Sequence, residues 1–299
     1  MLRVVLVIDE SGAKGYSKNQ EKEPNELGVM VGYLIPVEAL SQARSIAKEF
    51  FSHINAPDKL HLTSLTKAQQ KEVREFIYKI FKNNSTCWFY EAVFVQGFYK
   101  SVHQEGRGGC GKDELLHSKL FSGVFVKAIS RLRHERDKQL DILIITDPID
   151  KKISKQFKLE VQDYVDAITR TPRKRPITTY NKTKNEVENW TIESTITTED
   201  NSLFFDLIQY DIKCEDSGIT FIADVLANST LYYLRKKVRE KPDIKLNSRQ
   251  AIEDHPLSKQ LYGTYDADKM DIGSFSDLVL GLSLYPRISR NCRVFQFSF

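Results

Sequence analysis

The sequence predicts an α/β domain in which helices pack against a mixed β-sheet. Two runs, Leu2 to Ile8 and Leu140 to Ile145, are almost wholly aliphatic, as in strands that are covered on both faces. Between and after them lie long segments with apolar residues at helical spacing. Of the 299 residues, 41% are hydrophobic and 28% are charged, which is ordinary for a chain with a sizeable core. We therefore expect one folded domain with insertions.

The first third of the chain predicts three strands and two helices. Leu2 to Ile8 is followed by two acids, Asp9 and Glu10, at the expected end of the strand. Gly28 to Ile35 is a second strand that Pro36 ends, and we expect it to pair with the first as a hairpin. The remaining elements expected here are the helices Val37 to Ile54 and Lys67 to Phe81, the latter opened by a Thr66–Gln69 capping box, and the strand Cys87 to Gln96.

The rest of the chain alternates helices and strands as far as residue 240. A helix is expected at Glu114 to Leu132, and the strand Leu140 to Ile145 ends at Asp147 and Pro148. The further elements expected are the helix Lys155 to Ile168, a basic linker Thr169 to Asn185, β-like stretches Trp190 to Ile196 and Leu203 to Ile212, and the helix Gly218 to Arg239. We divide the chain into a domain at 1–240, with a basic insertion at 169–200, and a C-terminal extension at 241–299 packed on the same domain.

Composition limits the classes of function. No apolar run is long enough to cross a bilayer, and the apolar start is too short for a signal peptide, so we expect a cytoplasmic protein without membrane contact. The four cysteines are scattered without a C-x-x-C pair, which argues against a zinc site and against a disulfide framework.

The net charge of +4 mildly favours polyanionic partners. Candidate nucleic-acid contacts are Arg170, Arg173, Lys174 and Arg175, although such clusters are more commonly solvated surface.

Four acids stand where chemistry is expected. Asp9 and Glu10 follow one aliphatic run and Asp147 follows the other, while Asp224 lies in a helix whose neighbouring residues are nearly all apolar. A buried carboxylate must face water, pair with a cationic side chain or bind a metal ion. Mg²⁺ and Mn²⁺ prefer oxygen ligands, and two such ions can activate water for phosphodiester hydrolysis. The alternatives are capping or turn roles for the strand-end acids and a salt bridge for Asp224.

Asp9 and Glu10 do not rank equally as metal ligands. Adjacent strand residues point to opposite faces of a sheet, so both can face one site only if the turn has already begun. We rank Asp9 first and treat Glu10 as a further ligand or a positioning residue. His61 is a candidate proton shuttle, although a lone histidine in a short apolar piece is more often structural.

Three motifs in this order resemble a known family. They are Ile8-Asp9-Glu10-Ser11-Gly12, Ile144-Ile145-Thr146-Asp147 and Ala223-Asp224-Val225-Leu226-Ala227. The chain thereby resembles the bacterial family catalogued as domain of unknown function 3800. The resemblance implies a ribonuclease H-like fold with metal ligands on the first strand, a later strand and a C-terminal helix. It also implies nuclease activity, often in phage defence beside a partner protein. Thr220-Phe221-Ile222 departs from the glutamine that family members often carry before the A-D pair.

The sequence leaves other functions open. A catalytically inactive nucleic-acid-binding or protein-interaction module would keep the fold and the basic clusters without turnover. Gly106 to Lys112 has the spacing of a phosphate-binding loop, but Asp113 stands where Ser or Thr would bind magnesium, so we interpret it as a flexible loop and nucleotide hydrolysis as a weaker alternative. The sequence decides neither DNA against RNA nor whether the chain forms a homo-oligomer.

Overall fold

A mixed five-stranded sheet forms the centre of the molecule, with strand order β3-β2-β1-β4-β7. The computed structural model describes residues 1–13, 26–53, 61–84, 86–95, 112–133, 135, 138–194, 204–240 and 248–262. The pairs β1·β2 and β2·β3 are antiparallel, whereas β1·β4 and β4·β7 are parallel. The strands are β1 Leu2–Gly12, β2 Leu27–Pro36, β3 Trp88–Phe94, β4 Gln139–Thr146 and β7 Leu207–Cys214. The predicted α/β class with a mixed sheet is confirmed.

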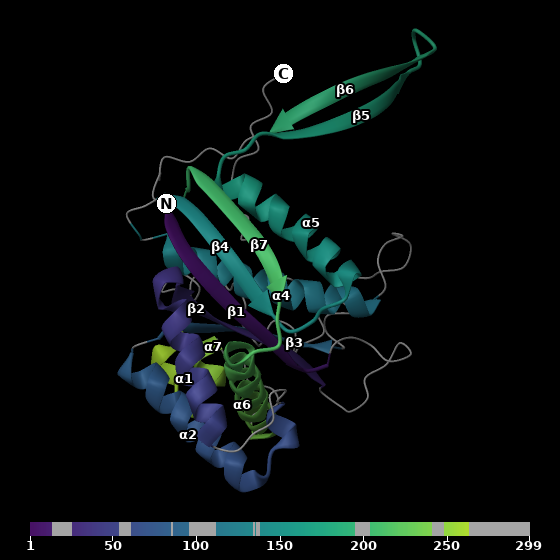
Figure 1. Cartoon of the computed structure of the whole chain (residues 1–299). Helices are drawn as coiled ribbons and strands as arrows, with labels where there is room; N and C mark the ends of the chain where they lie inside the picture. The colour runs from purple at the N-terminus through teal and green to yellow at the C-terminus, as the bar shows by residue number, and fades with distance from the viewer. Residues whose placement is uncertain are drawn as a thin grey trace.

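Helices cover both faces of this sheet (Figure 1). The helices on one face are α1 Leu40–His53, α2 Lys67–Asn83 and α6 Gly218–Glu240, and those on the other are α4 Lys112–Leu132 and α5 Lys151–Ile168. Side chains of β1 alternate between the two resulting cores. Val5 and Val7 belong to the core beneath α6, while Leu6 and Ile8 belong to the core beneath α4 and α5. β1 is thus buried on both faces, as its aliphatic sequence predicts.

β1 extends further than the sequence indicates. The strand runs to Gly12, so that Asp9 and Glu10 lie inside it, paired with Val31 and Met30 of β2. Gly12 has a φ of +86°, and a Cβ there would collide with the carbonyl oxygen of Leu27. Only glycine tolerates this combination, so the strand turns away there. The expectation that the strand stops at Asp9 and Glu10 is therefore wrong, since both acids lie within it.

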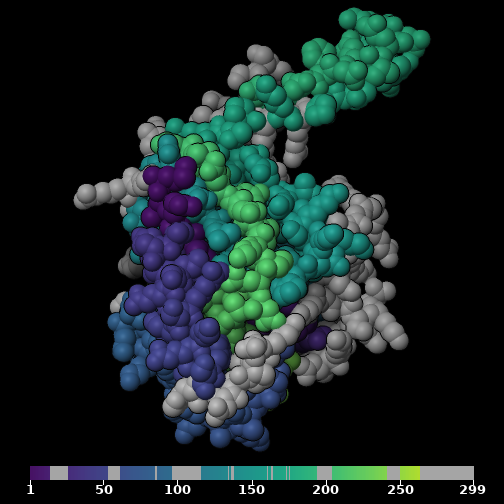
Figure 2. Space-filling model, in the orientation of Figure 1, coloured from purple at the N-terminus to yellow at the C-terminus, as the bar shows by residue number. Residues whose placement is uncertain are grey.

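The basic insertion is a hairpin instead of a linker. β5 Arg173–Asn181 pairs antiparallel with β6 Glu186–Ser194, and the ribbon stands away from the body of the protein (Figures 1 and 2). Trp190 is 57% exposed on this ribbon, and its Nε1 donates a hydrogen bond to Thr179 Oγ1. The β-like stretch predicted at Trp190 to Ile196 overlaps β6, whereas β5 lies within the predicted linker, because neither face of the hairpin packs on a core that would impose a pattern.

The described part of the C-terminal extension packs on the domain. It contains the short helix α7 Ser248–Ala251, and Leu257 and Leu261 are buried in the core beneath α6. The indole Nε1 of Trp88 donates to the Leu257 carbonyl oxygen at 2.9 Å. The stretch Phe275 to Leu284, expected to be regular, lies outside the described residues. None of the helices in the described ranges is long and apolar enough to cross a membrane.

His255 fastens this extension to α6. Its Nδ1 accepts a hydrogen bond from the Leu257 backbone N–H at 3.0 Å, so that Nε2 must carry the proton of the neutral ring. Nε2 lies 3.0 Å from the hydroxyl of Ser229, which in turn donates to the Leu226 carbonyl. Burial, with a smaller contribution from the charge of Lys82, lowers the pKa of His255 to about 3.

This histidine is expected to make the protein sensitive to acid. In the unfolded chain a histidine takes up a proton near pH 6.5, whereas folded His255 does so only near 3. Between these values the unfolded state binds more protons, so stability falls as the pH falls. From about pH 7 to about pH 4.5 the wild-type protein should lose roughly 2–3 kcal/mol more of its unfolding free energy than His255→Gln, measured by urea titration. Equal losses in the two proteins would contradict this assignment.

Candidate carboxylate site

Asp9 places a carboxylate on the sheet face that α6 covers. It continues the alternation of Val5 and Val7, which belong to the core beneath α6, and it is only 5% exposed. Burial raises the pKa of Asp9 well above its usual range, and repulsion by Glu10, Asp224 and Asp147 raises it further. All four acids singled out in the sequence therefore lie close enough to repel one another.

Asp147 joins this group from the end of β4. It follows Thr146, the last residue of the strand, where Pro148 prevents continuation. Burial raises the pKa of Asp147, a hydrogen bond with Thr220 partly offsets this, and the charges of Asp216 and Glu10 raise it again. The Oδ1 atom of Asp147 is buried, and no group among the described residues donates a hydrogen bond to it.

Asp224 enters the site from α6 and is held by a backbone donor. The N–H of Leu62 donates to Asp224 Oδ2 at 2.7 Å, which ties the short 3-10 helix Leu62–Ser64 to α6. Burial raises the pKa of Asp224, the Leu62 hydrogen bond and the neighbouring His61 lower it, and Asp147 and Glu10 raise it. His61 itself is exposed at the start of the 3-10 helix.

Glu10 points away from the other three acids. Because β1 continues to Gly12, Glu10 keeps the alternation of Leu6 and Ile8 and faces the side of the sheet that α4 covers. There its Oε2 lies 3.9 Å from Nε2 of buried His117. The charge of Glu10 still raises the pKa of Asp9, so it borders the site from the opposite face.

The donor set suits a hard divalent cation. Asp9, Asp147 and Asp224 offer carboxylate oxygens from three separate elements, which is the chemistry that Mg²⁺ and Mn²⁺ prefer. A cation would also satisfy the buried Oδ1 of Asp147. As they stand, no three His, Cys, Asp or Glu side chains of the described residues are arranged to hold an ion. The repulsion among the acids nevertheless reaches across this spacing, because Coulomb interactions act beyond ligand distances. Ligation therefore requires the carboxylates to turn toward one another.

Asp216 is a further acid that the sequence reasoning missed. It lies two residues beyond β7, and its charge raises the pKa of Asp147. Like Asp147 after β4, Asp216 is an acid that follows a strand, and β7 is parallel to β4 and ends at the same edge of the sheet. The Leu62 N–H carries no such signal, since any residue type supplies a backbone donor.

The predicted basic cluster is partly engaged within the protein. The Arg170 guanidinium stacks over the Phe204 ring at 4.1 Å, and Lys174 Nζ lies 3.6 Å from Glu193 Oε2 across the hairpin. Arg173 and Arg175 lie on β5, and their side chains lie outside the described part of the structure.

Most of the glycine-rich loop also lies outside the described residues, namely Gly106 to Gly111; Lys112 is the first residue of α4. The interpretation of Gly106 to Lys112 as a flexible loop stays a prediction. No protein-family model matches the chain and no curated protein matches it, so the resemblance described above rests on the three ordered sequence motifs alone.

Proposed function

We propose that the chain is a Mg²⁺- or Mn²⁺-dependent nuclease with a ribonuclease H-like fold. The sheet supports the fold: its first three strands are antiparallel neighbours, and β4 and β7 add in parallel beyond β1. The acids lie on β1, after β4 and on α6, which agrees with the layout that the family resemblance implies. By the same resemblance the proposal extends to phage defence beside a partner protein.

The buried carboxylate group carries the proposal. Asp9, Asp147 and Asp224 are desolvated, and Asp9 is repelled by the other two. Desolvation and like-charge repulsion both cost folding free energy, and in the described part of the chain no lysine or arginine is paired with these three acids. A structure retains such a cost where the group has a use, and strongly raised carboxylate pKa values are typical of functional sites.

Each residue of the site would have a separate role. Asp9, Asp147 and Asp224 would hold one or two divalent cations. When bound, such ions lower the pKa of a water molecule and neutralise charge on the scissile phosphate. The Leu62 N–H fixes the Asp224 carboxylate, and a carboxylate has enough lone pairs to accept this bond and still ligate. His61, exposed next to Asp224, stays a candidate for moving a proton at the mouth of the site.

The test is cleavage of labelled single- and double-stranded DNA and RNA by the full chain. We expect cleavage with Mn²⁺ or Mg²⁺ and none once EDTA is in excess, because the carboxylates alone supply no nucleophile. Cleavage that persists in EDTA would overturn the proposal. Nucleic-acid binding without any cleavage in either metal would favour the inactive binding module instead.

A further inference from the structure

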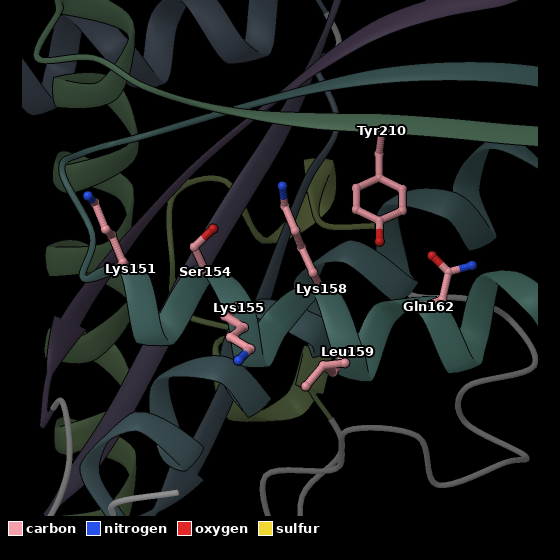
Figure 3. Close-up of a pocket in the computed structure, with 7 residues that line it drawn as sticks. All are labelled: Lys151, Ser154, Lys155, Lys158, Leu159, Gln162 and Tyr210. Atoms are coloured by element: carbon pink, nitrogen blue, oxygen red, sulfur yellow. The ribbon is translucent and has the colours of Figure 1, made fainter.

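A groove runs between helix α5 and the edge strand β7 (Figure 3). It encloses about 490 Å³ and is lined by Lys151, Ser154, Lys155, Lys158, Leu159, Gln162 and Tyr210. All but Tyr210 come from α5, and Tyr210 points from β7 toward the helix (Figure 3). β7 is the last strand of the sheet, and it is exposed beside α5 on the face seen in Figure 2.

Three lysines give this groove its charge. Lys151, Lys155 and Lys158 recur at intervals of four and three residues, so they follow one face of α5. All three are exposed, and among the described residues none of them has a carboxylate within ion-pairing distance. Lys213 on β7 differs, because its Nζ is paired with Glu215 Oε2 at 3.0 Å. The charge of the three α5 lysines is therefore available to an external anion.

One end of the groove lies near Asp147. α5 begins at Lys151, four residues after Asp147, with the Asp150 side chain accepting from the Lys152 N–H as its N-cap. β7 runs parallel to β4, so both walls of the groove reach the edge of the sheet where Asp147 lies. A chain of phosphates lying along α5 would reach the edge of the sheet at which Asp147 lies, beyond which Asp9 and Asp224 occupy the face that α6 covers.

A hollow on the opposite face of the sheet has a mainly acidic lining. The hollow between α1 and α2 is lined by Glu49, Glu72 and Glu75, with Lys79 as its only basic side chain among the lining residues. The lining of the α5 groove, with three lysines and no acid, is therefore more positive than that of this hollow.

Tyr210, the lining residue from β7, packs against two aromatic rings. The Tyr210 ring contacts the rings of Phe125 and Phe157 edge-to-face, at centroid distances of 5.5 and 6.4 Å. Burial raises the pKa of Tyr210, so its hydroxyl keeps its proton at neutral pH and can donate a hydrogen bond to an anion.

We propose that this groove binds the sugar-phosphate backbone of a nucleic-acid strand and leads it to the carboxylates. The inference rests on the proposed nuclease function and adds the route of the substrate. Lysines three and four residues apart on a helix are separated by about 4.5–6 Å along its axis, which corresponds to roughly one or two nucleotides. Each lysine can therefore reach a different phosphate. Backbone contacts of this kind position a strand without reading its sequence.

Binding of a fluorescein-labelled oligothymidylate in EDTA tests the groove without any cleavage. The variant Lys151→Gln/Lys155→Gln/Lys158→Gln should bind about tenfold more weakly than wild type at moderate salt. Its plot of log affinity against log salt concentration should be shallower by about 2, because each lost contact to a single strand contributes roughly 0.7 to the slope.

A matched triple variant controls for net charge. Lys48→Gln/Lys67→Gln/Lys79→Gln removes three exposed lysines from α1 and α2 on the opposite face of the sheet, and it should change the affinity less than about twofold. Equal thermal melting of all three proteins verifies folding. Equal affinities of the two triple variants, absence of binding by wild type, or a change in oligomer mass in place of binding would each overturn the groove.

The outcomes separate the two proposals. If the α5 triple variant loses binding while wild type never cleaves in Mg²⁺ or Mn²⁺, the groove stands and the nuclease function fails. If wild type cleaves with metal and the α5 triple variant binds and cleaves like wild type, the nuclease function stands and the groove fails.

Discussion

Asp9→Asn is expected to abolish metal-dependent cleavage and to stabilise the metal-free protein at the same time. The amide keeps the size of the side chain and removes the charge that would hold the cation, so cleavage should fall by at least about 10³-fold, or roughly 4 kcal/mol of transition-state stabilisation. Loss of activity through unfolding would instead lower the stability. The two measurements together therefore separate a role at the metal site from a structural role.

The stabilisation follows from the raised pKa of Asp9. An acid whose folded pKa lies above its unfolded value destabilises the folded protein at neutral pH, and this cost disappears as the pH falls through the folded value. Asparagine removes the cost at every pH. In metal-free buffer near neutrality we expect a gain on the order of 1 kcal/mol, which corresponds to a rise in Tm of roughly 2–4 °C. Mn²⁺ should raise the Tm of wild type and have little effect on the variant.

Asp141→Asn is the matched control for this experiment. Asp141 lies on β4 six residues before Asp147, at the other end of the strand, and pairs with Arg3 at 3.2 Å on the surface. Asp141→Asn should leave cleavage and the rise in Tm caused by Mn²⁺ unchanged. It should alter the free energy of unfolding by less than about 1 kcal/mol. A lower Tm for Asp9→Asn than for wild type without metal would contradict the assigned electrostatic cost.

Lys127→Met is expected to cost about 3–5 kcal/mol of stability. Lys127 Nζ lies 2.7 Å from Glu91 Oε2, with the two side chains only 13% and 11% exposed, and it also donates to the Tyr90 carbonyl at 2.6 Å. The pair joins α4 to β3. Methionine matches the length of lysine but leaves a largely buried carboxylate without its cation, and such a charge is costly. Urea unfolding near neutral pH measures the loss.

Two further variants test this explanation. Lys71→Met removes one partner of a helix-surface pair with Glu75 whose side chains are 79% and 67% exposed, and it should cost less than about 1 kcal/mol. The double variant Lys127→Met/Glu91→Gln should recover part of the loss, because the uncompensated charge is gone. If the double variant is no more stable than the single one, packing instead of charge explains the effect.

The sequence predicts elements well where one side chain pattern decides the structure. The aliphatic run of β1 continues to Ile8 as expected, and the capping box before α2 forms, with the Gln69 N–H donating to Thr66 Oγ1. The sequence is misleading where the apolar pattern ends but the strand continues. Asp9 and Glu10 interrupt the apolar run, yet backbone pairing with β2 continues through them to Gly12. The β5–β6 hairpin pairs with itself, so no core imposes an alternating pattern on its sequence.

The acids of the candidate site can be predicted from the sequence, but the groups that hold and surround them cannot. Asp9 and Asp147 stand out because acids after or within aliphatic strands are costly, and Asp224 stands out among apolar helix residues. The role of Leu62 depends on its backbone N–H, which no sequence motif encodes. Lys155 belongs to an ordinary amphipathic helix in the sequence; only the position of α5 beside the edge strand β7 turns its lysines into one surface.

The central place of β1 has a consequence for the protein during its synthesis. The strand leaves the ribosome before its parallel neighbour β4, which begins only at Gln139, and Asp224 follows later still on α6. Pairing over such separations is slow and cannot begin before the distant partner has emerged. A growing chain therefore carries Asp9 without the two other acids until the residues of α6 have been added. If the chain is the nuclease proposed above, its cutting site therefore stays incomplete until α6 has emerged from the ribosome.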